Sequence, residues 1–157
     1  MNASRVRLLT CMVIPLLTAC GPAPSEAMPM TYTCCEALDV DKPYQPGQTL
    51  TVDWTVESPE EPAGTPPQVE LAALLTGPFA TVGDLKAATE GGAPTVPGLV
   101  TFAAAPFRPS GMPDERPVST IVIGPDAKPG YYNLVTSVVG DGNTTSGASI
   151  IRVVPMP

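Results

Sequence analysis

The chain of 157 residues contains no histidine. Histidine is the commonest general acid or base in enzymes and the commonest protein ligand of transition metals, so its absence argues against most hydrolase mechanisms and most zinc sites. No other group of residues forms a recognisable catalytic set. We therefore predict a non-enzymatic protein without catalytic residues, a resident metal or a cofactor.

Basic residues are also scarce. Eight Lys and Arg stand against 15 Asp and Glu, which gives a formal net charge of −7. Nucleic acids and anionic lipid surfaces attract basic proteins and repel acidic ones. We therefore expect no nucleic-acid partner.

The N-terminus has the composition of an export signal. Arg5 and Arg7 precede an apolar run over 8–17, interrupted only by Thr10 and Pro15. Such a run is too short to span a bilayer as a stable anchor, but it matches the basic and apolar regions of a signal peptide. We predict that residues 1–19 are this signal peptide.

The leader ends at Leu17-Thr18-Ala19-Cys20, which resembles the bacterial lipobox. The resemblance implies cleavage before Cys20, acylation of its thiol, and lipid anchoring outside the cytoplasm, in the cell membrane or the outer membrane. By analogy with the known sorting rule, Gly21 in place of aspartate favours the outer membrane of a two-membrane cell. Cleavage would remove Arg5 and Arg7 and take the net charge from −7 to −9. The alternative is an ordinary signal peptide that happens to contain cysteines.

The remaining chain suits one domain. Residues 20–29 have no periodicity and are rich in proline, so we expect a flexible tether, followed by one domain over 30–157. Twenty-one prolines and 14 glycines, together with many β-branched residues, indicate short extended segments separated by turns. This composition favours an all-β domain.

The clearest strand pattern is QTLTVDWTV at 48–56. Leu50, Val52, Trp54 and Val56 alternate with polar residues, which predicts a strand with one buried face and places Trp54 in the core. A more apolar segment at 68–76 predicts a central strand, whereas 81–89 fits either a single helical turn or an edge strand. Further strands are expected around 30–38, within 98–106 and 118–124, and over 131–139 and 148–154, with a polar hairpin loop led by Asp141-Gly142.

The segment KPGYYNL resembles the entry to the penultimate strand of immunoglobulin-like sandwiches. The resemblance implies that Tyr132 forms a tyrosine corner, in which its hydroxyl bonds back to the backbone. The pairing of LTGPF with PGYYNLVTSVVGDGNTTSG is also similar to Ig-like modules of bacterial surface proteins, and the resemblance covers roughly the second half of the chain. Leu134 stands where the second core cysteine of antibody-type domains would fall, and Trp54 lies on the second expected strand instead of the third. We predict a single Ig-like antiparallel β-sandwich of about six to eight strands.

Cys34 and Cys35 are adjacent, which leaves several alternatives open. Neighbouring side chains on a strand point to opposite faces, so one thiol could be buried and the other exposed; in a local turn the two could instead form a strained disulfide. A third alternative is a Cu(I) site completed by Met28 or Met30. We expect a structural role, because copper would need three or four converging soft ligands.

Other acidic groups suggest weaker hypotheses. Asp39 with Asp41, and Asp141 with Asn143, could bind calcium, but neither pair matches the full twelve-residue loop pattern and turn formation explains both. Three further carboxylates are most simply a solvated charge run in a proline-rich loop: Glu57, Glu60 and Glu61.

These observations predict a membrane-anchored envelope lipoprotein that serves as a non-enzymatic interaction or structural module. The membrane is reached through the lipid on Cys20, and a protein or other envelope component is the expected partner. The polar segments SPEEPAGTPP and GDGNTTSG are the predicted contact loops. The alternative function is an extracytoplasmic copper-binding or thiol-redox protein that uses Cys34 and Cys35.

Overall fold

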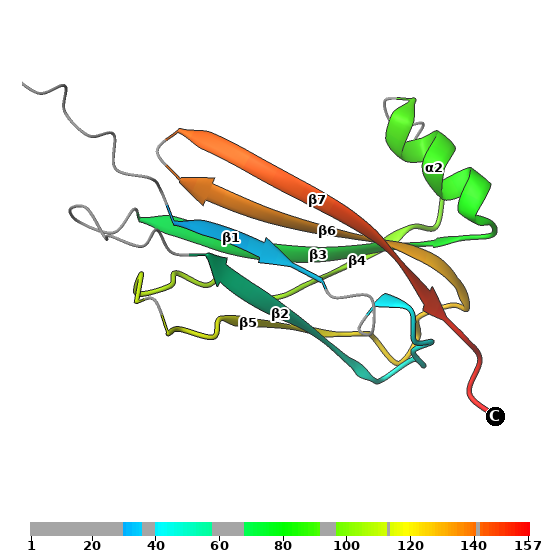
Figure 1. Ribbon diagram of the computed structural model, residues 1–157. Helices are drawn as coiled ribbons and strands as arrows, with labels where there is room; N and C mark the ends of the chain where they lie inside the picture. Colours follow the sequence, from blue (N-terminus) through cyan, green and yellow to red (C-terminus); the bar gives the residue numbers. More distant parts are fainter. Residues whose placement is uncertain (1–29, 36–39, 58–67, 92–96, 113, 141) are drawn as a thin grey trace, which may run out of the picture.

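The computed structural model describes residues 30–35, 40–57, 68–91, 97–112, 114–140 and 142–157. These residues form two antiparallel β-sheets that pack face to face, with one short helix beside them (Figure 1). The prediction of an all-β antiparallel sandwich is confirmed.

One sheet has three strands and the other has four. The three-stranded sheet has the order β1 (Thr31–Cys34), β2 (Thr49–Glu57), β5 (Val118–Val122). The four-stranded sheet has the order β4 (Val100–Ala103), β3 (Val69–Phe79), β6 (Gly130–Gly140), β7 (Asn143–Val153). The core lies between them because each strand turns its apolar side chains toward the opposite sheet.

Strand β2 behaves as its alternation predicts. Leu50, Val52 and Trp54 are buried, and the intervening Thr51 and Asp53 are exposed. Trp54 keeps only 4% of its surface exposed. The prediction that Trp54 is a core residue is therefore confirmed.

Strand β3 is central, as its apolar composition predicts. It pairs with β4 on one side and with β6 on the other. Leu71, Ala73 and Leu75 are completely buried on its inner face. Because β3 has a partner strand on each side, it lies inside the four-stranded sheet and not at its edge.

Tyr132 on β6 makes the hydrogen bond that the resemblance implied. Its side chain is fully buried, and its hydroxyl donates to the backbone carbonyl of Lys128 over 2.8 Å. The absence of a side chain at Gly77 makes room for the ring, since a Cβ there would lie 2.5 Å from Tyr132 Cδ1. The predicted tyrosine contact at the start of the penultimate strand is confirmed.

Replacing Tyr132 with phenylalanine should lower the free energy of unfolding by about 1 kcal/mol, because one hydrogen bond is lost while the ring stays packed. Urea unfolding measures the change. Tyr131→Phe is the matched control, since the Tyr131 hydroxyl, on the neighbouring residue, has no hydrogen-bond partner among the described residues. Equal stability of Tyr132→Phe and the parent would contradict a stabilising role for this contact.

The ambiguous segment at 81–89 forms a helix, longer than a single turn. Helix α2 spans Val82–Glu90 and begins with a capping box. The Thr81 hydroxyl accepts from the Asp84 amide, and the Asp84 carboxylate accepts from the Thr81 amide, each over 3.1 Å. This reciprocal capping satisfies two free amides at the helix start and explains why the segment does not extend as a strand.

The last strand begins earlier than predicted. We predicted a hairpin loop through GDGNTTSG, but Asn143–Gly147 belongs to β7 and continues the pairing with β6 up to the pair Gly140 and Asn143. The prediction of a long loop here is wrong. Eleven paired residues of β6 override the weak strand propensity of this polar segment.

Candidate functional site

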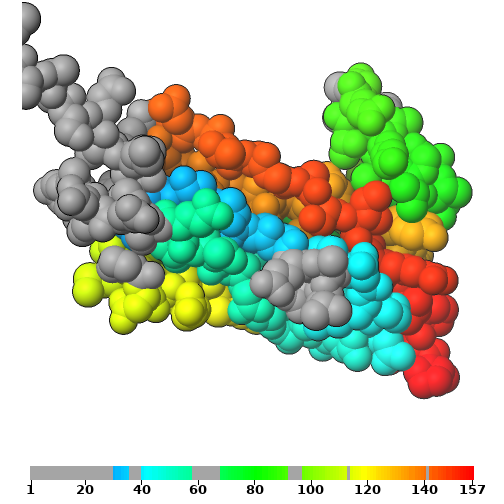
Figure 2. Space-filling model, viewed as in Figure 1, coloured from blue at the N-terminus to red at the C-terminus, as the bar shows by residue number. Residues whose placement is uncertain are grey.

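The sandwich has an open side between β1 and β7, the edge strands of the two sheets. One end of this side is closed by Tyr44, which pairs in parallel with Val153 of β7. The Tyr44 amide donates to the Arg152 carbonyl over 2.9 Å, and the Val154 amide donates to the Tyr44 carbonyl over 2.8 Å. Figure 2 shows β7, in orange, running above β1, in blue.

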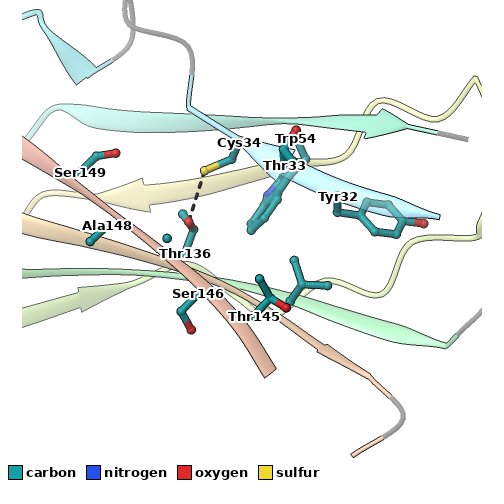
Figure 3. Close-up of a pocket in the computed structure, with 11 residues that line it drawn as sticks. Tyr32, Thr33, Cys34, Trp54, Thr136, Thr145, Ser146, Ala148 and Ser149 are labelled. Carbon is teal, nitrogen blue, oxygen red and sulfur yellow. Dashed lines mark hydrogen bonds between the residues drawn. The ribbon is translucent and has the colours of Figure 1, made fainter. Parts of the chain in front are cut away.

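A cleft of about 280 Å³ lies along this open side (Figure 3). Four strands contribute to it. The lining residues are Tyr32, Thr33 and Cys34 from β1, Trp54 from β2, Thr136 and Val138 from β6, and Thr145, Ser146, Gly147, Ala148 and Ser149 from β7. None of these side chains carries a formal charge at neutral pH. The cleft thus combines hydroxyl groups with a few apolar surfaces.

Hydrogen bonds fix the inner wall of the cleft. Trp54 Nε1 donates to the Ser119 hydroxyl over 3.0 Å, which orients the indole inside the core. Thr136 Oγ1 lies 3.3 Å from Cys34 Sγ, across the gap between the sheets (Figure 3). Because a disulfide sulfur has no proton, the hydroxyl is the donor. This contact ties β1 to β6.

Tyr32 is the exception among the buried polar groups. Its side chain is 6% exposed, and its hydroxyl has no hydrogen-bond partner within the described part of the chain. Burial raises the pKa of this hydroxyl, and the carboxylate of Glu115 raises the pKa further. The Tyr32 hydroxyl is therefore neutral near neutral pH, and its proton makes no hydrogen bond to the described residues.

Cys34 and Cys35 form a disulfide, so the structure selects the second of the two structural alternatives. The Cα atoms are 3.7 Å apart, and Cys35 has φ = 75°. This left-handed backbone conformation is unusual for a residue with a side chain. The regular course of β1 ends here, with Cys34 opposite Trp54 on β2.

Replacing both cysteines with serine should lower the free energy of unfolding by about 1 kcal/mol, since a bridge between adjacent residues closes only a minimal loop. The domain should remain folded because both cysteines are only partly buried, at the edge of a core formed by other side chains. Thermal unfolding followed by circular dichroism measures the change. Loss of folding in the double serine variant would show that the bridge is essential.

The other candidate residues do not gather at one site. Met30 packs partly against the core, whereas the other three are exposed: Asp41 precedes β2, Glu57 ends β2 and Asn143 begins β7. Among the described residues, no group of three or more His, Cys, Asp or Glu could hold a metal ion. The remaining candidates lie outside the described residues: Cys20, Met28, Asp39, Glu60, Glu61, Asp141 and the contact loop SPEEPAGTPP.

The sequence did not reveal the β7 wall of the cleft. Its odd-numbered residues turn toward the sandwich, but three of them are Thr145, Gly147 and Ser149, which give no hydrophobic alternation. The available signal was the dipeptide Asp141-Gly142 in the sequence, because such a dipeptide is typical of a two-residue hairpin turn after which the returning strand starts at once.

Comparison with protein-family models and with curated proteins finds no match for this chain. Within the described ranges, no helix has the length and hydrophobicity needed to cross a membrane.

Proposed function

We propose that the protein is a lipid-anchored envelope protein whose β-sandwich acts as a non-enzymatic interaction module. The observation that carries the proposal is the open side between β1 and β7, which presents an uncharged cleft and an edge of β7 that pairs with no further strand among the described residues. A cleft without charged side chains suits binding better than acid–base catalysis. The lipobox-like Leu17-Thr18-Ala19-Cys20 supports the membrane anchor.

The Ig-like assignment is part of the proposal. Its support is the strand order, in which the first, second and fifth strands form one sheet and the third, sixth and seventh lie side by side in the other. The Tyr132 contact also matches the tyrosine corner of such domains. Ig-like domains make many of their contacts through exposed strands and loops, and this likeness supports an interaction role by analogy.

Affinity capture with a variant of the strand edge tests the interaction role. The full chain is immobilised and exposed to envelope extract, in parallel with the variant Ala148→Pro. We expect the parent to retain an envelope component, including any further copy of the chain, that the variant does not retain. Identical capture by both would contradict binding through the open side.

A thiol-redox function is the second candidate, because Cys34 lines the cleft and forms a disulfide with Cys35. A dithiol reagent would transfer two electrons and two protons to the bridge, giving two thiols and the oxidised reagent. Maleimide labelling under native conditions measures the result. Two reactive thiols in the folded protein support this function, whereas thiols that appear only after unfolding exclude it.

A further inference from the structure

The four edge strands differ in how they are protected from pairing with another chain. Strands β1 and β4 have only four residues each, and β5 has five residues, with Pro117 directly before it. Short strands and prolines at a sheet edge discourage the addition of a further strand. Strand β7 has eleven residues and contains neither a proline nor a register shift.

The hydrogen bonds between β7 and Tyr44 show which backbone groups of β7 point away from β6. The Arg152 carbonyl and the Val154 amide bond to Tyr44, so the backbone groups of even-numbered residues point away from β6. Pairing with β6 is regular along the whole of β7. The amides and carbonyls of Thr144, Ser146 and Ala148 therefore point outward too, and none of them has a hydrogen-bond partner in the described residues.

We propose that the stretch Thr144–Ile150 pairs with the same stretch of a second copy of this chain. The two strands run antiparallel about a two-fold axis at Gly147, which joins the two four-stranded sheets into one. Ser146 then faces Ala148 of the partner subunit, and Thr144 faces Ile150 of the partner subunit. In this register, every outward-pointing amide and carbonyl of Thr144–Ile150 has a partner in the second copy. The second copy is then the partner in the interaction function proposed above, on which this inference rests.

The absence of charge and the small side chains along the β7 edge favour a second copy as the occupant. The chain carries a net charge of −7, so two copies repel each other over most of their surface. Asn143–Ile151 contains no charged residue, and its side chains up to Ser149 are all small or medium in size. Two such edges can approach each other without contacts between like charges or between bulky side chains. An identical surface on both subunits is the usual basis of a two-fold dimer.

Charge substitutions within Thr144–Ile150 test the proposed pairing register. In the variant S146E/A148E, glutamates would face each other across the axis; in S146K/A148E, each lysine would face a glutamate of the other copy. The full chain is studied by sedimentation equilibrium in density-matched detergent. We expect twice the protein mass of one chain for the parent and for S146K/A148E, and the mass of a single chain for S146E/A148E.

A proline variant provides an independent test. Ala148→Pro removes an amide that points away from β6, so it should block strand addition without breaking the β6–β7 ladder. We expect a folded monomer, with folding checked by circular dichroism. If this variant unfolds, the two charge variants still decide the question.

Two results would overturn the proposal. The first is a parent chain that stays monomeric at every concentration, which would leave the interaction function open to a different envelope partner. The second is a dimer that persists in S146E/A148E and in Ala148→Pro, which would place the interface on another face.

Discussion

Replacing Trp54 with alanine should lower the free energy of unfolding by about 3 to 5 kcal/mol, because a large buried aromatic side chain would leave a cavity between the sheets. Trp54 is 4% exposed, and its Nε1 bonds to Ser119. A domain of this size has a total stability of roughly 5 to 15 kcal/mol. A substantial part of the variant should therefore be unfolded under mild conditions. Urea unfolding followed by circular dichroism measures the loss.

Val122→Ala is the matched control, since Val122 lies on the neighbouring strand β5 with 61% of its surface exposed. Its substitution should change the stability by at most about 0.5 kcal/mol. Ser119→Ala isolates the hydrogen bond and should cost about 1 to 3 kcal/mol, because it leaves the buried indole N–H without an acceptor. If Trp54→Ala unfolds at the same urea concentration as the parent, Trp54 is not the centre of this core.

Replacing Cys20 with alanine should abolish the incorporation of fatty acid and release the protein from the membrane fraction or leave it uncleaved. The lipobox-like sequence needs a thiol at this position, and no other residue of the leader offers a thiol in that context. Each buried methylene of an acyl chain contributes about 0.8 kcal/mol to membrane binding, so two or three chains hold a small protein firmly.

Metabolic labelling with a fatty-acid probe, followed by cell fractionation, measures this effect. Cys11→Ala is the control, because Cys11 lies within the apolar run and should not be acylated. A Cys20→Ala variant that still takes up the probe and stays with the membrane would show that the anchor lies elsewhere.

The sequence predicted those parts of the fold that depend on local patterns. Alternation at 48–56 identified β2 and its buried Trp54, and KPGYYNL identified the start of β6 and the contact of Tyr132. Both depend on residues that are close together in the chain. The order of the strands in each sheet and the presence of the Cys34–Cys35 bridge depend on contacts between distant segments or on backbone conformation, which these patterns do not encode.

The candidate site was predicted only in part. Cys34 was singled out for its neighbour Cys35, and the structure places it in the lining of the cleft. The opposite wall was mistaken for a loop, because Asn143–Gly147 is polar and has weak strand propensity. Pairing with β6 makes it a strand, and its position at the sheet edge leaves it open for an interaction.

Photo-cross-linking in living cells tests most directly whether the open side of the sandwich makes the contacts of the proposed membrane-anchored interaction module. A photoreactive side chain at Ser146 probes the free edge of β7, and the same group at the exposed Val122 on β5 is the control. We expect a cross-linked product from position 146 in the membrane fraction and none from position 122, with a product of twice the chain mass if the partner is a second copy. Cross-linking at position 122 alone, or equally at both positions, would contradict an interaction through the open side.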